Sequence, residues 1–288
     1  MEWLKNLSNA IEYIEDNLDK EISYEEAAGI ACCSTYYFQR LFSYVVGIPL
    51  SEYIRRRRMS QAAFELQRAD RKVLDVALKY GYTSPTSFNR AFQSVHGITP
   101  AAAKNKGSIL NAYPPIRFSV KVTGGSAMSY RITETGAIRF VGIRIPLTAD
   151  MEENQRIVPG FWKDTLGKKH FSDICLLSDE NPEGILGISV YNDPGNIFYY
   201  IAAATSKETP AGMYEYEIPA TTWVVFENDG YFKENVQEVF KRFFTEWLPF
   251  SGYEYAGLPD IEVYPVIKGK PTCGHSEVWI AIRKEKEK

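Results

Sequence analysis

The chain has 288 residues, of which 45% are hydrophobic and 24% charged, and its net charge is −3. This composition excludes disordered and fibrous proteins, and the apolar runs are far shorter than the roughly 18 residues of a membrane span. The N-terminus lacks a signal-peptide pattern, so we expect a cytoplasmic protein with no membrane partner. The four cysteines form no CxxC pair and the three histidines are scattered, so neither a metal site nor a cofactor is predicted.

Charge and breaker residues divide the sequence in two. Residues 31–107 carry 12 Lys or Arg against 4 Asp or Glu, which suggests a polyanionic partner. Residues 1–107 hold 8 Gly plus Pro and the remainder holds 27, so helices should come first and strands and turns second. We therefore expect a helical domain over 1–107, a linker or leading strand over 108–127, and a second domain over 128–288.

The first helical signals precede residue 31. Five aliphatic residues between Leu4 and Leu18 fall at helical spacing and predict an amphipathic helix. Ser23-Tyr24-Glu25-Glu26 has the form of a capping box, in which Ser23 accepts from the Glu26 amide and the Glu26 carboxylate reaches back. A short helix should begin near residue 24.

An internal repeat with an offset of fifty residues follows. Phe38-x-Arg40-x-Phe42 with Gly47-Ile48 recurs as Phe88-x-Arg90-x-Phe92 with Gly97-Ile98. Each copy reads as a short helix, a turn, a serine N-cap, a second helix and a glycine stop, which is a helix-turn-helix. An uninterrupted helix from Leu50 to Leu66 should join the two units.

The second helix of each unit has an apolar face and a polar face. The polar residues suit base edges, because Arg can bond guanine, Asn or Gln can bond adenine, and Thr or Tyr can contact thymine or phosphate. A solvated polar surface is the alternative. The candidate DNA-binding residues are Tyr36, Gln39 and Arg40 in the first unit and Thr86, Asn89 and Arg90 in the second.

Residues 55–58 are four consecutive arginines on the joining helix. Four such residues sweep about 300° around a helix axis, so they cannot all face one partner. We expect one or two of them to reach phosphate and the others to be solvated or paired with acids such as Glu52.

These motifs resemble the DNA-binding domain of AraC/XylS-type transcription regulators. The resemblance rests on the segment from Tyr36 to Phe42, Gly47-Ile48-Pro49, and the stretch from Ser87 to Pro100. It implies that two helix-turn-helix units occupy adjacent major grooves of double-stranded promoter DNA, using the six residues named above, and that RNA polymerase is a further partner. Pro85 departs from the family, since many relatives place a polar side chain there.

Alternating apolar stretches after residue 115 predict strands and turns. A hairpin or linker strand is expected over 116–132, and a helix near each of Trp162 and Trp247. The order strand-helix-strand-strand then occurs twice, and Tyr130/Tyr216 and Phe140/Phe226 share one offset. The fold class is thus an all-α domain followed by an α+β domain of two pseudo-symmetric repeats. Further strands are expected over 138–145, 187–191, 198–203, 221–226, 261–264 and 278–282.

This second part resembles the GyrI-like effector-binding domain. The resemblance rests on Ile261-Glu262-Val263-Tyr264, Ser276-Glu277-Val278-Trp279-Ile280 and two shorter motifs. It implies a cleft between two halves with a glutamate at its base. We place this glutamate at Glu277, which shares a strand face with Trp279, and a carboxylate among aromatic rings would favour lipophilic cations. The candidate effector-binding residues are Glu277, Trp279, Trp223 and Trp162.

The leading hypothesis is a transcription regulator controlled by a small-molecule effector. One alternative is a GyrI-like hydrolase or ligand-sequestering activity fused to a DNA-binding domain, with Glu277 as general base. Another is a regulator whose C-terminal domain binds a protein partner. No nucleophile elbow, histidine-carboxylate spacing or phosphate loop accompanies Glu277, so we do not expect an enzyme.

Overall fold

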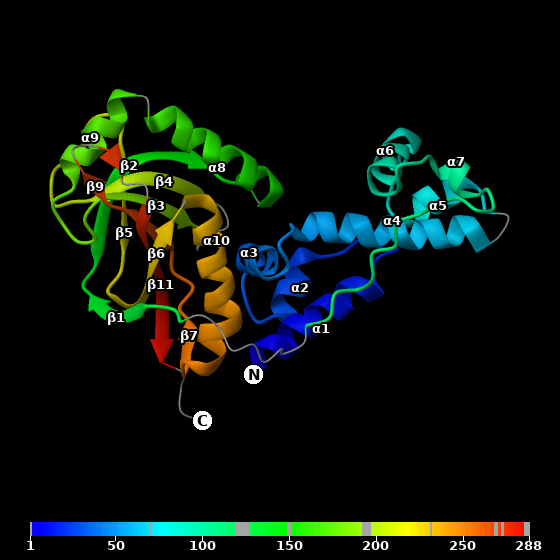
Figure 1. The fold of residues 1–288 in the computed structure, drawn as a ribbon, viewed down its shortest axis with the longest axis horizontal. Coiled ribbons are helices and arrows are strands. Elements are labelled where there is room, and N and C mark those ends of the chain that lie inside the picture. The colour runs from blue at the N-terminus through cyan, green and yellow to red at the C-terminus, as the bar shows by residue number, and fades with distance from the viewer. Residues whose placement is uncertain are drawn as a thin grey trace. The chain divides into compact units, whose positions relative to one another are not determined.

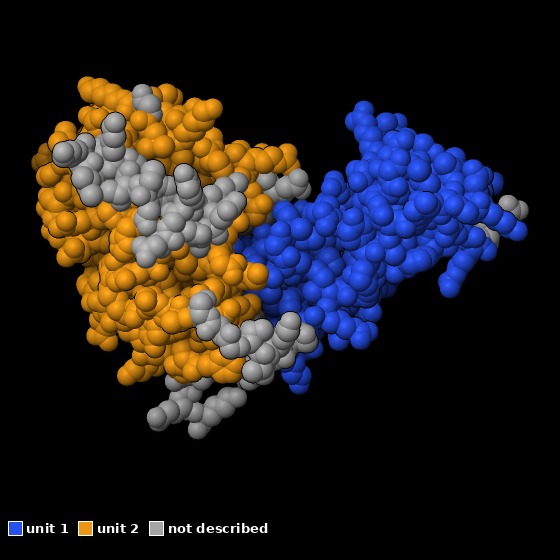
Figure 2. All heavy atoms as spheres, viewed as in Figure 1, with its two compact units in different colours: residues 1–122 blue, residues 123–288 orange. Residues whose placement is uncertain are grey.

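The computed structural model describes residues 2–68, 71–118, 127–148, 151–166, 168–191, 197–230, 232–267, 270–271 and 274–284. Contacts divide the chain into two compact units, residues 1–122 and 123–288, coloured separately in Figure 2. Among the helices within those ranges, none has the length and apolar composition that a membrane span requires. Each unit is described on its own below.

The first unit is helical, as its few breaker residues predict (Figure 1). Ser34 and Ser84 cap the second helix of each repeat by accepting from the backbone N–H groups of Tyr37 and Ser87. Gly47 and Gly97 end these helices in the left-handed conformation, which favours glycine. The helices are α1 (Glu2–Asp16), α2 (Tyr24–Ile30), α3 (Thr35–Val46), α4 (Leu50–Arg68), α5 (Val73–Lys79), α6 (Pro85–His96) and α7 (Pro100–Ala103).

Two helix-turn-helix units are therefore present, α2 with α3 and α5 with α6, joined by α4. Phe38 and Phe42 are completely buried in the first unit, as are Phe88 and Phe92 in the second. The repeated phenylalanines thus anchor both second helices by the same face, and the fifty-residue repeat corresponds to a repeated structure.

The capping box at Ser23 is only half formed. The Ser23 hydroxyl accepts from the Glu26 N–H at 3.1 Å, as predicted. The Glu26 carboxylate does not reach back, however, because the Tyr13 hydroxyl lies between the two groups. Tyr13 donates to Glu26 Oε2 at 2.9 Å and accepts from the Ser23 N–H at 3.4 Å. The tyrosine of α1 thereby ties α1 to the start of α2.

The four arginines of α4 are all engaged within the first unit. Arg55 and Arg56 pair with Glu52. Arg57 is buried against Glu15 of α1, and Arg58 donates to the backbone oxygens of residues 18 and 20. The expected pairing with Glu52 is therefore confirmed for Arg55 and Arg56. Contact of one or two of the four arginines with phosphate stays a prediction.

Residues 108–118 run along the helical unit without regular secondary structure. At the C-terminal end of α6, the Asn111 N–H donates to His96 Nδ1 and the Asn111 side chain donates to the Val95 carbonyl oxygen. The Tyr113 N–H donates to the Ser60 hydroxyl of α4. The Ile116 N–H donates to the Tyr53 hydroxyl. The strand expected over 116–132 is absent at 116–118, where the Ile116 N–H bonds α4. Residues 119–126 lie outside the described residues, and residues 130–132 lie in a strand, as expected.

The second unit holds a nine-stranded antiparallel sheet with the order β1-β6-β11-β8-β3-β4-β2-β5, and β7 pairs with β11. The strands predicted from residue 138 onwards are all present, and β5, β7 and the short β9–β10 pair were not predicted. The strands are β1 (Tyr130–Thr135), β2 (Ile138–Pro146), β3 (Ile185–Val190), β4 (Phe198–Ala204), β5 (Tyr214–Ile218), β6 (Thr221–Gly230), β7 (Tyr253–Tyr255), β8 (Asp260–Tyr264), β9 (Val266–Ile267), β10 (Lys270–Pro271) and β11 (Gly274–Lys284).

Helices contact one face of this sheet. α9 (Lys169–Leu177) packs on β2 and β4, and α10 (Phe232–Arg242) packs on β6 and β11 (Figure 1). α8 (Met151–Leu166) supplies Trp162 to the same face, and α10 continues into η1 (Phe243–Trp247) and η2 (Leu248–Phe250). The opposite face carries a core that includes Phe140, Trp223 and Trp279. The two faces therefore offer different surroundings to the predicted ligand residues.

Candidate functional site

The polar face of α6 is open. Thr86 and Arg90 are exposed and Asn89 is half-buried, while Phe88 and Phe92 on the opposite side are completely buried. Pro85 occupies the first helical turn. Backbone N–H groups there have no partner within the helix, so a proline costs no helical hydrogen bond. The helix therefore presents Thr86, Asn89 and Arg90 together, as the spacing predicts.

The corresponding residues of α3 are buried. Tyr36, Gln39 and Arg40 are 8%, 4% and 5% exposed. The Arg40 Nε donates to the Tyr44 hydroxyl at 3.2 Å, and the guanidinium carbon lies 5.3 Å from the centre of that ring. Helical spacing shows which side of α3 faces away from its own phenylalanines, but it does not determine whether that side is open.

Glu277 is held by an arginine of the neighbouring sheet edge. Arg131 of β1 donates to both carboxylate oxygens at 2.8 Å, and the Trp279 indole N–H donates to Oε2 at 2.7 Å. Burial raises the pKa of Glu277, but these hydrogen bonds and the Arg131 charge outweigh it, so the pKa lies below its usual value. Glu277 and Trp279 share one strand face, as predicted, but the carboxylate already has a cationic partner.

The four predicted effector-binding residues do not converge on one place. Trp223 is completely buried beside Trp279, with ring centres 5.9 Å apart, and its indole N–H donates to Thr135. Both tryptophans belong to the core on the face that carries Glu277. Trp162 contacts Tyr199 and Tyr264 on the helix-covered face instead.

Trp162 instead lies beside a second carboxylate, Glu262 of β8. The Tyr264 hydroxyl donates to Glu262 Oε2 at 2.7 Å and the Tyr199 hydroxyl to the same oxygen at 3.3 Å. The Trp162 N–H donates to the Tyr199 hydroxyl at 2.8 Å, and its ring meets Tyr264 edge-on at 5.2 Å. Glu262, Trp162, Tyr199 and Tyr264 are called the Glu262 cluster below.

Gly187 of β3 makes room for this cluster. It lies opposite Glu262 in the β3–β8 register. A Cβ atom at Gly187 would lie 2.3 Å from the Tyr199 hydroxyl and 3.1 Å from Glu262 Oε2, so any side chain here would displace the hydroxyl. The sequence signal for the cluster is the alternation in residues 261–264, which separates Glu262 and Tyr264 from the apolar Ile261 and Val263.

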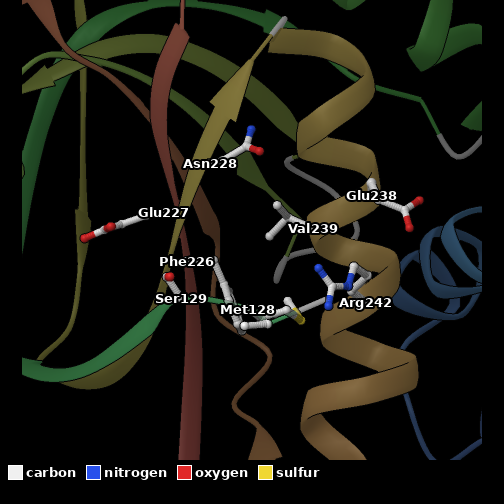
Figure 3. A pocket seen from close by; sticks show the side chains of 9 residues that line it. Met128, Ser129, Phe226, Glu227, Asn228, Glu238, Val239 and Arg242 are labelled. Carbon is white, nitrogen blue, oxygen red and sulfur yellow. The ribbon is translucent and has the colours of Figure 1, made fainter. Parts of the chain in front are cut away.

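A pocket of about 320 Å³ lies between β6, α10 and residues 127–129 (Figure 3). Phe226 and Asn228 of β6 face α10 across it, whereas Glu227 points to the other side of the strand. None of the predicted effector-binding residues lines this pocket. Its lining residues are Ala127, Met128, Ser129, Phe226, Glu227, Asn228, Glu238, Val239 and Arg242.

Comparison with known families assigns both parts of the chain. Residues 128–283 match the family described as GyrI-like small molecule binding domain, and residues 27–106 match a helix-turn-helix domain family. The first match covers more than half of the chain.

Individual proteins are similar to parts of the chain. The transcriptional activator AarP of Providencia stuartii is 41% identical over 95 residues, which are 33% of this chain and 70% of AarP. The uncharacterized HTH-type transcriptional regulator YbfP of Bacillus subtilis (strain 168) is 26% identical over 213 residues, covering 65% of this chain and 72% of YbfP. The solved structure of SAV2435 bound to tetraphenylphosphonium is 20% identical with a TM-score of 0.48, covering 54% of this chain and 94% of that one.

The arrangement of two helix-turn-helix units on one long helix, the sheet domain and these matches agree with one another. The chain belongs to the AraC-type DNA-binding transcription regulators that carry a GyrI-like small-molecule-binding domain.

Proposed function

We propose that the C-terminal domain senses a lipophilic cation at the Glu262 cluster and thereby controls promoter binding. The observation that carries this proposal is that the Glu262 carboxylate accepts hydrogen bonds from two tyrosine hydroxyls next to the Trp162 ring. The negative charge of Glu262 and the electron-rich faces of the rings both attract a cation, and the apolar ring surface suits a lipophilic one.

Glu262 is a better candidate than Glu277. Arg131 already bonds both oxygens of Glu277, so a cationic ligand there would have to displace a bidentate ion pair. Glu262 accepts hydrogen bonds from the hydroxyls of Tyr264 and Tyr199, beside the ring of Trp162. Tyr199 and Tyr264 are buried, and the Trp162 N–H donates to the Tyr199 hydroxyl, so we expect an entering ligand to displace Trp162 of α8.

Trp162 also provides the readout. We expect tetraphenylphosphonium to change the tryptophan fluorescence of the full-length protein in a saturable way. Glu262→Gln keeps the shape of the side chain and removes its charge, so binding should weaken about tenfold or more. Glu277→Gln is the matched control, and it should leave the affinity unchanged.

The other outcomes are equally informative. Loss of binding in Glu277→Gln with normal binding in Glu262→Gln would place the ligand site at Glu277, on the face of the sheet that carries Arg131. A response that survives both changes would point to the pocket of Figure 3. If cations, neutral aromatics and anions all gave no response, the C-terminal domain would fit a protein partner better, and the sensing proposal would fail.

DNA readout is proposed for the second helix of each unit. Thr86, Asn89 and Arg90 are supported by their placement on the open face of α6. Tyr36, Gln39 and Arg40 occupy the equivalent positions of α3, fifty residues earlier in the repeat, and are proposed to contact bases in the same way. α4 has 19 residues and so spans about 28 Å, which approaches the roughly 34 Å between successive major grooves.

A contact to RNA polymerase is part of the same proposal. Leu74 and Leu78 lie one helical turn apart on α5 and are exposed, and Phe64 of α4 is also exposed. The relative AarP is named as an activator. Replacing Leu74 and Leu78 together by Ser should leave operator affinity unchanged and reduce transcription in a purified system, whereas unchanged transcription would remove this surface from the proposal.

The two halves of the C-terminal domain are proposed to be pseudo-symmetric repeats. If β1 is taken as equivalent to β5, β2 to β6, β3 to β8 and β4 to β11, the order of strands in the sheet is the same from either edge. Tyr130 pairs with Phe226 between β1 and β6, and Phe140 pairs with Tyr216 between β2 and β5. These pairs are the tyrosines and phenylalanines that share one offset in the sequence, so sequence and register support one duplication.

A further inference from the structure

A second charged group of the C-terminal domain is surrounded by aromatic rings, and its charge is positive. Arg144 of β2 is half-buried at the end of the sheet near β5. Its guanidinium carbon lies 3.9 Å from the centre of the Phe198 ring and 4.2 Å from that of Tyr214. Its Nη1 donates to the Tyr200 hydroxyl at 2.9 Å.

The strand pairing explains why these side chains meet. Arg144 lies directly opposite Tyr200 in the β2–β4 register, and Phe198 lies opposite Pro146 two positions along. Tyr214 of β5 lies opposite Gly142. Because side chains two residues apart on a strand share a face, Arg144, Phe198, Tyr200 and Tyr214 all project from the same face of the sheet.

The arginine has no anionic partner within the described part of the chain. A guanidinium carries five N–H donors, and the described structure uses one of them, towards Tyr200. The rings lie close to the guanidinium carbon and limit its access to water. The remaining N–H groups, at the edge of the planar group, are therefore left to bond an acceptor from outside.

The same sheet shows which acceptor such an arginine takes. Arg131 lies near the ring of Trp279, with its guanidinium carbon 5.7 Å from the ring centre, and it bonds both oxygens of Glu277 at 2.8 Å. A ring-supported guanidinium in this sheet thus binds a carboxylate through two parallel bonds. Arg144 has the rings and the donors of that arrangement, but no carboxylate among the described residues pairs with it.

We infer that Arg144, Phe198, Tyr200 and Tyr214 form a binding site for the carboxylate of a small molecule with an aromatic or other apolar body. The guanidinium edge would bond the carboxylate, as Glu277 is bonded by Arg131. Tyr214 is 47% exposed, so its ring offers an apolar surface beside the charge. This site is separate from the Glu262 cluster, prefers the opposite charge and does not depend on the proposed cation sensing.

The test uses benzoate as the probe with the full-length protein. Isothermal titration calorimetry should give saturable binding to the wild type, and benzamide, which has the same ring without the charge, should not compete. Arg144→Gln should weaken benzoate binding about tenfold or more, because a bidentate charge-assisted pair is lost. Arg283→Gln, at an exposed arginine of β11 that pairs with Glu254, is the matched control and should bind benzoate normally.

A lysine variant and a second anion test the donor geometry and the charge separately. Arg144→Lys retains the positive charge without the planar pair of donors, so it should bind benzoate more weakly than the wild type and should serve if the Gln variant fails to fold. Inorganic phosphate should compete poorly, and equal affinity for phosphate would overturn the carboxylate assignment. Benzoate affinity that is equal in the wild type and Arg144→Gln, or no saturable binding to the wild type, would overturn the site.

Discussion

The Arg57 guanidinium of α4 holds the Glu15 carboxylate of α1 by three hydrogen bonds, Nε to Oε1 at 2.9 Å, Nε to Oε2 at 3.0 Å and Nη2 to Oε2 at 2.6 Å. Arg57 is buried, so removing it leaves a partly buried carboxylate without its cation. Arg57→Ala should lower the free energy of unfolding by about 3 kcal/mol, measured by urea denaturation. Arg55→Ala breaks a more exposed pair with Glu52 and should cost no more than about 1 kcal/mol. Equal losses in the two variants would contradict the structural role of Arg57.

Arg90 on the open face of α6 gives a prediction for DNA recognition. Arg90→Ala should weaken binding to the operator by about 1–3 kcal/mol and relax the preference for one base pair. Arg40→Ala tests the first unit in the same way. Fluorescence anisotropy with operator and random duplexes at one fixed salt concentration measures both affinities. If a variant lost affinity equally on operator and random DNA, its arginine would contact phosphate only.

The close approach of β2 and β4 gives a prediction for folding. Gly142 of β2 lies opposite Ala202, and a Cβ atom added there would lie 2.2 Å from the Ile201 carbonyl oxygen. The neighbouring atoms are backbone and cannot rotate away. Gly142→Ala should therefore lower the free energy of unfolding by about 1–3 kcal/mol, the usual cost of overpacking, as measured by urea denaturation. Gly136→Ala, which meets open space, is the control. Equal stability of the two variants would refute the close approach.

The sequence predicts the fold well where local chemistry decides it. Ser34, Ser84, Gly47 and Gly97 mark the ends of α3 and α6 because capping and left-handed termination are local events. The partners of side chains far apart in sequence are not predictable in this way. Tyr13 displaces Glu26 from the Ser23 N–H, and Arg57 meets Glu15 from a position 42 residues away.

The ligand site shows the same limit. Strand alternation places Glu277 and Trp279 on one face, which the structure confirms. Alternation equally separates Glu262 and Tyr264 from Ile261 and Val263, so the pattern offers two glutamates. Only the packing of β1 against β6 brings Arg131 to Glu277, and only α8 brings Trp162 to Glu262. The choice between the two carboxylates therefore needs the tertiary structure.

The Glu277 pKa gives a prediction for acid stability. Because its pKa is below the usual value in the folded chain, the unfolded state binds a proton first as the pH falls. The stability that the carboxylate contributes is thus present above its ordinary pKa and is lost as the pH falls through the folded value. Glu277→Gln should flatten the decline in stability below about pH 4.5, measured by urea denaturation at several pH values. A decline as steep as in the wild type would mean that Arg131 does not stabilise the charge.

His96 gives a prediction at milder pH. Its Nε2 lies 3.0 Å from the Met59 carbonyl oxygen, and its Nδ1 accepts from the Asn111 N–H at 3.2 Å, so the neutral ring carries its proton on Nε2. Burial lowers the pKa of His96, although the bond to Met59 opposes this effect. A proton on Nδ1 would also face the Asn111 N–H, so protonation breaks one of the two hydrogen bonds from Asn111 to α6.

The sign of the effect follows from the direction of that shift. As the pH falls through about 6.5, the ordinary value for histidine, the unfolded chain takes up a proton that the folded chain does not, and stability decreases. His96→Gln should remove this part of the decline between about pH 7 and 5 in urea denaturation. His170→Gln changes an exposed histidine and should leave the decline as it is in the wild type. If the wild type and His96→Gln lost stability in parallel over this range, the neutral, buried His96 would have no part in the pH response.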